Sequence, residues 1–191
     1  MYGSAVYMEK VLKNRSIIMK ILPPVLMIIL AALDQFTKLL TVEYIKPVGS
    51  VPLININGTE WLNLTYCENT GMSFSLLEGQ RLILIGVPVL LITAVCWFIY
   101  SGKVKRNDMI IALSVLAGGG LGNLIDRVLL GYVVDFIDFR IINFAIFNFA
   151  DICAVCGGIY IGAVLLITEI KEDREKKAAA DEPENDKHED A

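Results

Sequence analysis

The sequence predicts an α-helical membrane protein that crosses the bilayer four times. Of its 191 residues, 55% are hydrophobic and only 20% are charged, and its mean hydropathy is +0.57. So strong an apolar bias excludes a disordered chain and disfavours an ordinary soluble domain. The apolar residues also gather into stretches of about 17–25 residues, the length that a helix needs to cross the hydrocarbon core.

Four such stretches follow one another along the chain. They cover residues 17–42, 82–100, 109–130 and 152–168. The basic flank of the first stretch could also belong to a cleavable signal peptide, but no small-x-small cleavage site follows it and three more spans come after it. We therefore expect a retained helix, and four crossings place both termini on the same side of the membrane.

Lysine and arginine in the short flanks predict the orientation, because cytoplasmic flanks are enriched in them. Basic residues cluster before the first span and between the second and third spans: Lys10, Lys13, Arg15, Lys20, Lys103, Lys105 and Arg106. The connections 44–80 and 131–150 contain only Lys46 and Arg140. We expect cytoplasmic termini and two long extracytoplasmic connections.

These two connections have unusual sequences. Residues 44–78 combine turn residues with the alternation typical of strands in VPLININ and WLNLTY, which predicts a small β element on the outer membrane face. Residues 136–147 are apolar and aromatic, with only Asp138 and Arg140 charged, so we expect this segment to lie in the membrane interface.

Net charge and rare residues exclude several classes of function. Residues 171–191 hold 5 Lys and Arg against 9 Asp and Glu, which accounts for the whole net charge of −4. We expect this tail to be disordered and cytoplasmic, and residues 1–170 to form one neutral domain with no basic excess for nucleic acid.

The single histidine, His188, lies in the tail, so neither a zinc hydrolase nor a hydrolase with a His-activated nucleophile can be assembled. Cys153 and Cys156 form a CxxC inside an apolar run, which we interpret as packing rather than a redox or metal site. We expect no metal and no cofactor.

Ionisable residues within a span are costly and are therefore functional candidates. Asp34 and Lys38 are spaced i,i+4, which suits an intrahelical ion pair or a role in shaping a site. Asn123, Asp126 and Arg127 share one side of the third span, where the acid and the arginine could neutralise each other or neighbouring helices.

Two carboxylates stand at the outer boundary of adjacent spans. Asp135 follows the third span and Asp151 begins the fourth, so they could meet at one depth. Two close carboxylates share a proton, and such a pair can hydrolyse an amide. The alternatives are an acid in the first helical turn for Asp151 and a solvated loop acid for Asp135.

Five motifs in a fixed order resemble those of lipoprotein signal peptidase, the type II signal peptidase of bacteria. They are DQFTK (34–38), ENTGMSFS (68–75), GNLIDR (122–127), GYVVDF (131–136) and FNFAD (147–151). The resemblance covers about residues 17–168. Met72 and Ser73 replace smaller residues common in the second motif, and Ile152 replaces a common Ser.

The resemblance implies an aspartyl endopeptidase of the bacterial cytoplasmic membrane that cleaves diacylglyceryl-modified prolipoproteins before the lipidated Cys. It implies a catalytic pair, Asp135 and Asp151, near the extracytoplasmic face, a β-cradle over 44–78 and a loop helix over 136–147. The supporting polar positions are Asp34, Lys38, Asn69, Asn123, Asp126, Arg127 and Asn148. The partners that we expect are these prolipoproteins and membrane lipid, not nucleic acid, and a monomer suffices.

Two other classes compete with this interpretation. A four-helix transporter would line a polar path with its intramembrane charges, and a non-catalytic scaffold would use the carboxylates only for pairing. The charges collect toward one end of the spans, and residues 82–100 contain none, which disfavours conduction.

Overall fold

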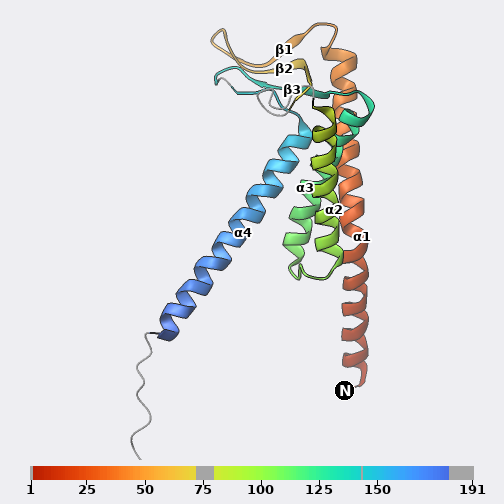
Figure 1. The fold of residues 1–191 in the computed structure, drawn as a ribbon, viewed down its shortest axis with the longest axis vertical. Helices are drawn as coiled ribbons and strands as arrows, with labels where there is room; N and C mark the ends of the chain where they lie inside the picture. Colours follow the sequence, from red (N-terminus) through yellow and green to blue (C-terminus); the bar gives the residue numbers. More distant parts are fainter. Residues whose placement is uncertain (1, 72–79, 143, 181–191) are drawn as a thin grey trace, which may run out of the picture.

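The computed structural model describes residues 2–71, 80–142 and 144–180. Figure 1 shows helices that run roughly lengthwise and a small sheet at one end of them. In chain order the elements are α1 (Tyr2–Leu40), the π-helical turn η1 (Thr41–Ile45), β1 (Ser50–Ile56), β2 (Thr59–Asn69), α2 (Arg81–Tyr100), α3 (Asn107–Leu129), β3 (Val133–Phe139) and α4 (Phe149–Ala180).

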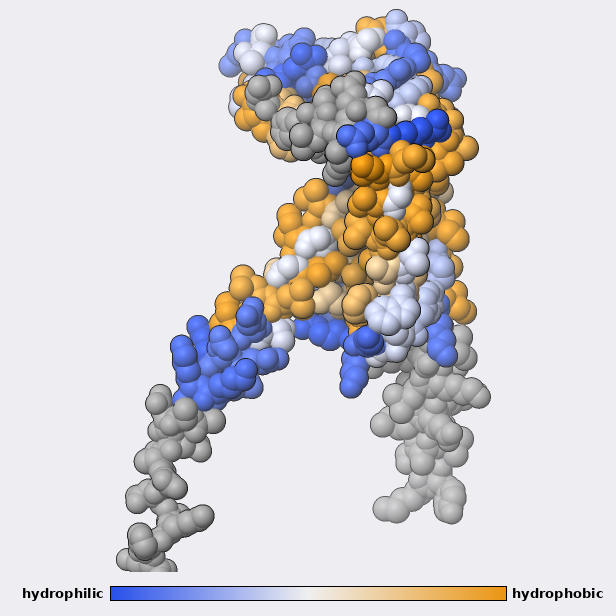
Figure 2. Space-filling model, viewed as in Figure 1, coloured by the Kyte–Doolittle hydropathy of each residue, from blue (hydrophilic) through white to orange (hydrophobic). Residues whose placement is uncertain are grey.

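The four expected spans are confirmed. The helical segments long and apolar enough to cross a membrane are Ile18–Ile45, Arg81–Tyr100, Asn107–Leu129 and Phe149–Lys177. Their outward side chains are apolar, and Figure 2 shows this surface as a hydrophobic band between hydrophilic regions at the two ends. Such a surface is stable where the surrounding solvent is lipid.

Helix α3 lies at the centre of the bundle and packs against α1, α2 and α4. Glycines bring its backbone close to its neighbours. A Cβ atom on Gly119 would meet the carbonyl oxygen of Ala150 and the backbone nitrogen of Ala154 in α4. Beyond this contact α4 diverges from the other helices with distance from the sheet (Figure 1).

The sheet is antiparallel with the strand order β1-β2-β3. Asn57 and Gly58 join β1 to β2 with positive φ angles of 53° and 82°, as a two-residue hairpin of the primed type requires. In the next pair, Cys67 lies opposite Asp135 and Asn69 opposite Val133. The β element predicted over 44–78 is thus present, and its residues 72–78 lie outside the described residues.

The loop helix expected over 136–147 is wrong, since none of the described residues in that range is helical. Residues up to Phe139 belong to β3, and Phe147 returns to form a β-bridge with Ile137. The β-branched and aromatic residues of this run suit a strand, and the free edge of β2 supplies the backbone partners. Val133 and Val134 point to opposite faces, yet both are buried, so the run shows no alternation.

The tail also differs from expectation. Helix α4 continues to Ala180, so the first ten residues of the segment expected to be disordered are helical. Lys171 and Glu175, like Glu172 and Lys176, are spaced i,i+4 with opposite charges, and alanines follow; both features favour a helix. Residues 181–191 lie outside the described part of the chain.

Gly119→Ala should push α3 and α4 apart, because the new methyl group would meet α4 backbone that cannot rotate away. We expect a loss of about 1–3 kcal/mol of stability, as for other overpacked interiors, measured by thermal unfolding in detergent. Gly162→Ala is the matched control, since a Cβ at Gly162 meets nothing within 4 Å. Equal stability of the two variants would contradict the close α3–α4 approach.

Candidate active site

A cavity of about 480 Å³ lies where the sheet meets the helices, and residues of β2, α2, α3, β3 and α4 line it. Its polar lining residues are Asn69, Asn123, Arg127, Asp135 and Asp151. The rest of its wall is largely apolar and includes Pro88, Phe144, Ile152 and Val155. Both carboxylates predicted to meet therefore line one cavity.

Asp135 projects from β3 and is only 2% exposed. Its Oδ2 accepts a hydrogen bond from Asn69 Nδ2 at 2.8 Å, and its Oδ1 accepts one from Asn148 Nδ2 at 2.6 Å. Burial raises the pKa of Asp135 to about 6; the negative charge of Asp151 adds to this, and the two asparagine donors oppose it. Asp135 is thus a carboxyl that protonates far more readily than an exposed one.

Asp151 lies in the first turn of α4. Its Oδ1 accepts a hydrogen bond from Asn123 Nδ2 at 2.8 Å, and its Oδ2 accepts one from the backbone N–H of Asn148 at 3.1 Å. In return, Asn148 Oδ1 accepts from the backbone N–H of Asp151 at 3.0 Å. This reciprocal pair is a capping box, and the Asn-x-x-Asp spacing in FNFAD encodes it.

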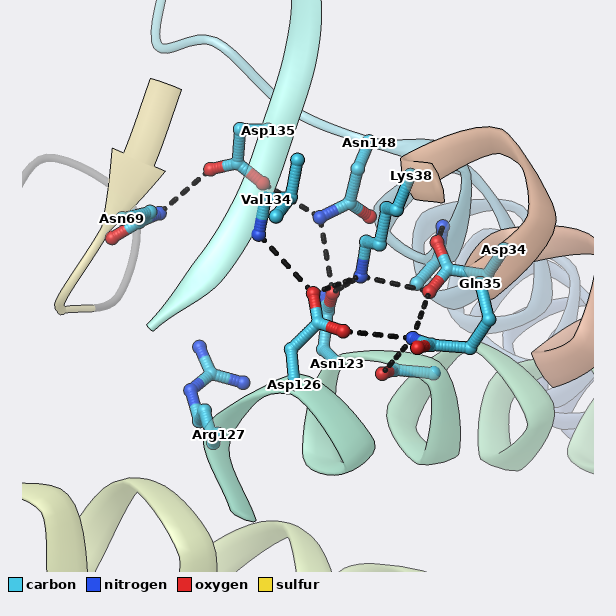
Figure 3. Close-up of polar contacts among 12 residues, drawn as sticks. Asp34, Gln35, Lys38, Asn69, Asn123, Asp126, Arg127, Val134, Asp135 and Asn148 are labelled. Carbon is cyan, nitrogen blue, oxygen red and sulfur yellow. Dashed lines mark hydrogen bonds and ion pairs between the residues drawn. The ribbon is translucent and has the colours of Figure 1, made fainter. Parts of the chain in front are cut away.

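The ammonium of Lys38 holds the centre of a buried cluster next to the cavity (Figure 3). It lies 2.7 Å from Asp34 Oδ2 and 2.9 Å from Asp126 Oδ2, and it donates to Asn123 Oδ1 at 2.8 Å. Three donors thus meet three acceptors. Asp34 is fully buried and Lys38 is 3% exposed, and this complete pairing is what makes such burial tolerable.

The orientation of the two asparagine side chains follows from this cluster. Asn123 Oδ1 accepts from Lys38 and, at 3.0 Å, from Asn148 Nδ2. The amide nitrogen of Asn123 must therefore face Asp151. Asn148 donates its two amide hydrogens to Asn123 and Asp135, so neither amide can flip without losing hydrogen bonds.

The expected partners of the helical charges are confirmed in part. Asp34 and Lys38 form the predicted i,i+4 ion pair. Asp126 pairs with Lys38 on another helix instead of with Arg127, and its Oδ2 also accepts the backbone N–H of Val134 at 3.1 Å. Adjacent residues on a helix point in different directions, so Arg127 lies apart from the cluster (Figure 3).

Arg127 faces the cavity with unused donors. Its Nη2 donates to the carbonyl oxygen of Gly71 at 3.2 Å, whereas its Nε is buried and has no hydrogen-bond partner in the described part of the chain. A guanidinium in this position can donate hydrogen bonds to the carbonyl oxygens of an extended peptide.

Gln35 also belongs to this cluster, although the sequence motifs do not single it out. Gln35 Nε2 donates to Asp126 Oδ1 at 2.8 Å and to the carbonyl oxygen of Gly122 at 3.1 Å, so Gln35 helps to join α1 to α3. Its signal was available, because Gln35 is an uncharged polar residue within an apolar span and directly follows Asp34.

The cysteines of the CxxC and the residues that depart from the family motifs lie at different places in the structure. Cys153 and Cys156 are free; Cys153 is buried and adjacent to Gly119, as expected for a packing residue, and Cys156 lines the cavity. Ile152 also lines the cavity. Met72 and Ser73 lie outside the described residues.

Lys38→Met should leave two buried carboxylates without their cation. We expect a loss of about 3–5 kcal/mol, the usual cost of removing one partner of a buried ion pair, measured by thermal unfolding in detergent. Lys46→Met is the control, because the Lys46–Glu68 pair is exposed to solvent and should be nearly neutral. A Lys38→Met variant as stable as Lys46→Met would contradict the central role of this ammonium.

Comparisons with known proteins agree with one another. A model of the signal peptidase (SPase) II family matches residues 26–169. The chain is similar to the lipoprotein signal peptidase of Caldanaerobacter subterraneus subsp. tengcongensis, with 43% identity over 136 residues that cover 70% of this chain and 88% of the relative. The lipoprotein signal peptidase of Streptococcus pneumoniae is 35% identical over 162 residues, covering 85% of this chain and 97% of the relative.

Two solved structures, each described as a bacterial membrane enzyme, share the fold. One, at 2.3 Å resolution, has a TM-score of 0.64 and 29% identity, covering 88% of this chain and 93% of the other. The second, at 1.9 Å resolution, has a TM-score of 0.66 and 33% identity, covering 75% and 92%. With four membrane spans, one cavity that collects two carboxylates, and a family match over most of its length, the chain belongs to the signal peptidase II family.

Proposed function

We propose that this protein is an aspartyl endopeptidase that removes the signal peptide from diacylglyceryl-modified prolipoproteins, cutting before the lipidated Cys. Family membership supports the removal of signal peptides from prolipoproteins. One observation supports the aspartyl mechanism most directly: Asp135 and Asp151 line a single cavity. Each of their four carboxylate oxygens accepts a hydrogen bond from an N–H group.

The proposed reaction needs only water and the two carboxyl groups. One carboxylate takes a proton from water as the water oxygen attacks the scissile carbonyl carbon. The other carboxyl donates a hydrogen bond to the carbonyl oxygen and then gives its proton to the departing amide nitrogen as the C–N bond breaks. Asn69, Asn123 and Asn148 hold both carboxyls in place throughout.

The cavity wall suits a substrate anchored in lipid. Val155 lines the cavity but is 57% exposed on the surface of α4, and Ile152 and Phe144 also line it and are exposed. The apolar wall is therefore continuous with the lipid-facing surface. A diacylglyceryl-anchored peptide at this boundary presents its scissile bond at a fixed depth, beside the two carboxyls and the guanidinium of Arg127.

We propose that this boundary is the extracytoplasmic one, with both termini in the cytoplasm. The support is the distribution of basic residues. Lys103, Lys105 and Arg106 lie between α2 and α3, at the end of those helices away from the sheet, and basic residues favour the cytoplasmic side.

The competing functions have weaker support. A transporter requires polar groups along the whole depth of the membrane, whereas the buried charges Asp34, Lys38 and Asp126 gather beside the sheet end of the helices. A scaffold requires only paired carboxylates, but neither Asp135 nor Asp151 forms an ion pair within the described residues.

Asp135→Asn and Asp151→Asn should each lower kcat by about 10³-fold or more, the scale of general acid–base catalysis. Cleavage of a lipidated prolipoprotein by purified protein measures this. Asp138→Asn is the matched control: Asp138 is a buried acid of the same strand, points to its other face, and pairs with Arg140 at 2.8 Å. Full activity of either dyad variant would sink the aspartyl mechanism.

Substrate choice provides a separate test. Purified protein incubated with a diacylglyceryl-modified prolipoprotein and with its unmodified form should cut only the lipidated one. Addition of a chelator should leave the rate unchanged, since the carboxyls carry the reaction. Equal cleavage of both substrates would contradict the proposed lipid requirement, and inhibition by the chelator would contradict the two-carboxyl mechanism.

A further inference from the structure

We infer that the two carboxyls have fixed and different roles before substrate arrives: Asp151 is the ionised group that takes the proton from water, and Asp135 carries the proton that reaches the leaving amide. This assignment rests on the proposed function, because it gives the roles of base and acid to the two carboxyls of the same pair. It follows from the different places of the two residues in the fold.

Asp151 occupies a position that favours negative charge. It lies in the first turn of α4, where the helix dipole acts like about half a positive charge. One of its oxygens accepts a backbone N–H from Asn148 at the helix start, and the other accepts the side-chain N–H of Asn123. The side chain is only partly buried, so it also retains some contact with the cavity.

Asp135 occupies a position that disfavours negative charge. It lies within a strand, and sheets provide little net dipole. The preceding residues Val133 and Val134 are each 1% exposed, and Asp135 itself is 2% exposed. Burial first and the charge of Asp151 second raise the pKa of Asp135 to about 6, against the two asparagine donors that lower it. The raised pKa of Asp135 is thus what its buried position in a strand leads one to expect.

The pair also has charged neighbours. Arg127 lines the same cavity as both carboxyls. Lys38 is already engaged by Asp34 and Asp126, so that cluster carries a net negative charge. The charged and titratable groups around the pair are Asp34 and Lys38 from α1, Cys67 and Glu68 from β2, Asp126 and Arg127 from α3, Asp138 from β3, and Cys156 from α4.

Two asparagines make the assignment testable, because each donates to one carboxyl of the pair. Asn123 donates to Asp151 and Asn69 donates to Asp135, whereas Asn148 contacts both. A donated N–H stabilises the ionised form and lowers the pKa, so removal of the donor raises the pKa of that carboxyl. Each substitution therefore removes a direct hydrogen bond from one member of the pair only.

The experiment is the pH dependence of kcat/KM for the wild type, Asn123→Ala and Asn69→Ala. A base must be ionised, and loss of the Asn123 donor makes ionisation of that base harder, so Asn123→Ala should move the acidic limb to higher pH by about one unit. An acid must be protonated, so a higher pKa of Asp135 in Asn69→Ala should move the basic limb to higher pH by about one unit. Asn55→Ala, an exposed asparagine of β1, should move neither limb.

If Asn123→Ala moves the basic limb and Asn69→Ala moves the acidic limb, the assignment is overturned and Asp135 is the base. If either variant moves both limbs, the two carboxyls share the proton, and the assignment of fixed roles is overturned as well. Neither result touches the proposed function, which is tested separately by the Asp135→Asn and Asp151→Asn variants and by substrate choice. If Asn123→Ala does not fold, Asn69→Ala decides alone.

Discussion

The buried ammonium of Lys38 is the interaction on which the site depends. Its ion pairs with Asp34 and Asp126 join α1 to α3. Each of these carboxylates then holds a further element, since Asp34 accepts the backbone N–H of Ala150 at 2.9 Å and Asp126 accepts that of Val134. Ala150 and Val134 directly precede Asp151 and Asp135, so one cation fixes the starting points of both α4 and β3.

The side-chain amides of Asn123 and Asn148 connect the Lys38 cluster to the two carboxyls in the cavity. Asn123 and Asn148 have no charge of their own, so they can link the ammonium to the carboxyls without neutralising them. The arrangement resembles other buried polar networks in that each member is satisfied only while the others stay in place. The placement of both carboxyls and the protonation states proposed for them thus have the same structural origin.

Composition and spacing predict much of this architecture, and the limits are physical. The spans follow from apolar length alone, and Asp135 and Asp151 share a cavity as their boundary positions suggest. The fate of 136–147 was not predictable locally, because the strand β3 acquires its backbone partners from β2, some seventy residues earlier in the chain. Similarly, Asp126 pairs with Lys38 on another helix. The nearest cation in the sequence is Arg127, whose side chain points away from Asp126 (Figure 3).

The exposure of cavity residues such as Val155 on α4 has a consequence for the proposed lipid-anchored substrate. A site that shares a wall with the lipid-facing surface receives molecules that diffuse in two dimensions. The quantity that sets its rate is then the surface density of substrate in the membrane rather than its amount per volume. Enlarging the bilayer at a constant number of substrate molecules should slow the protein as dilution slows a soluble enzyme.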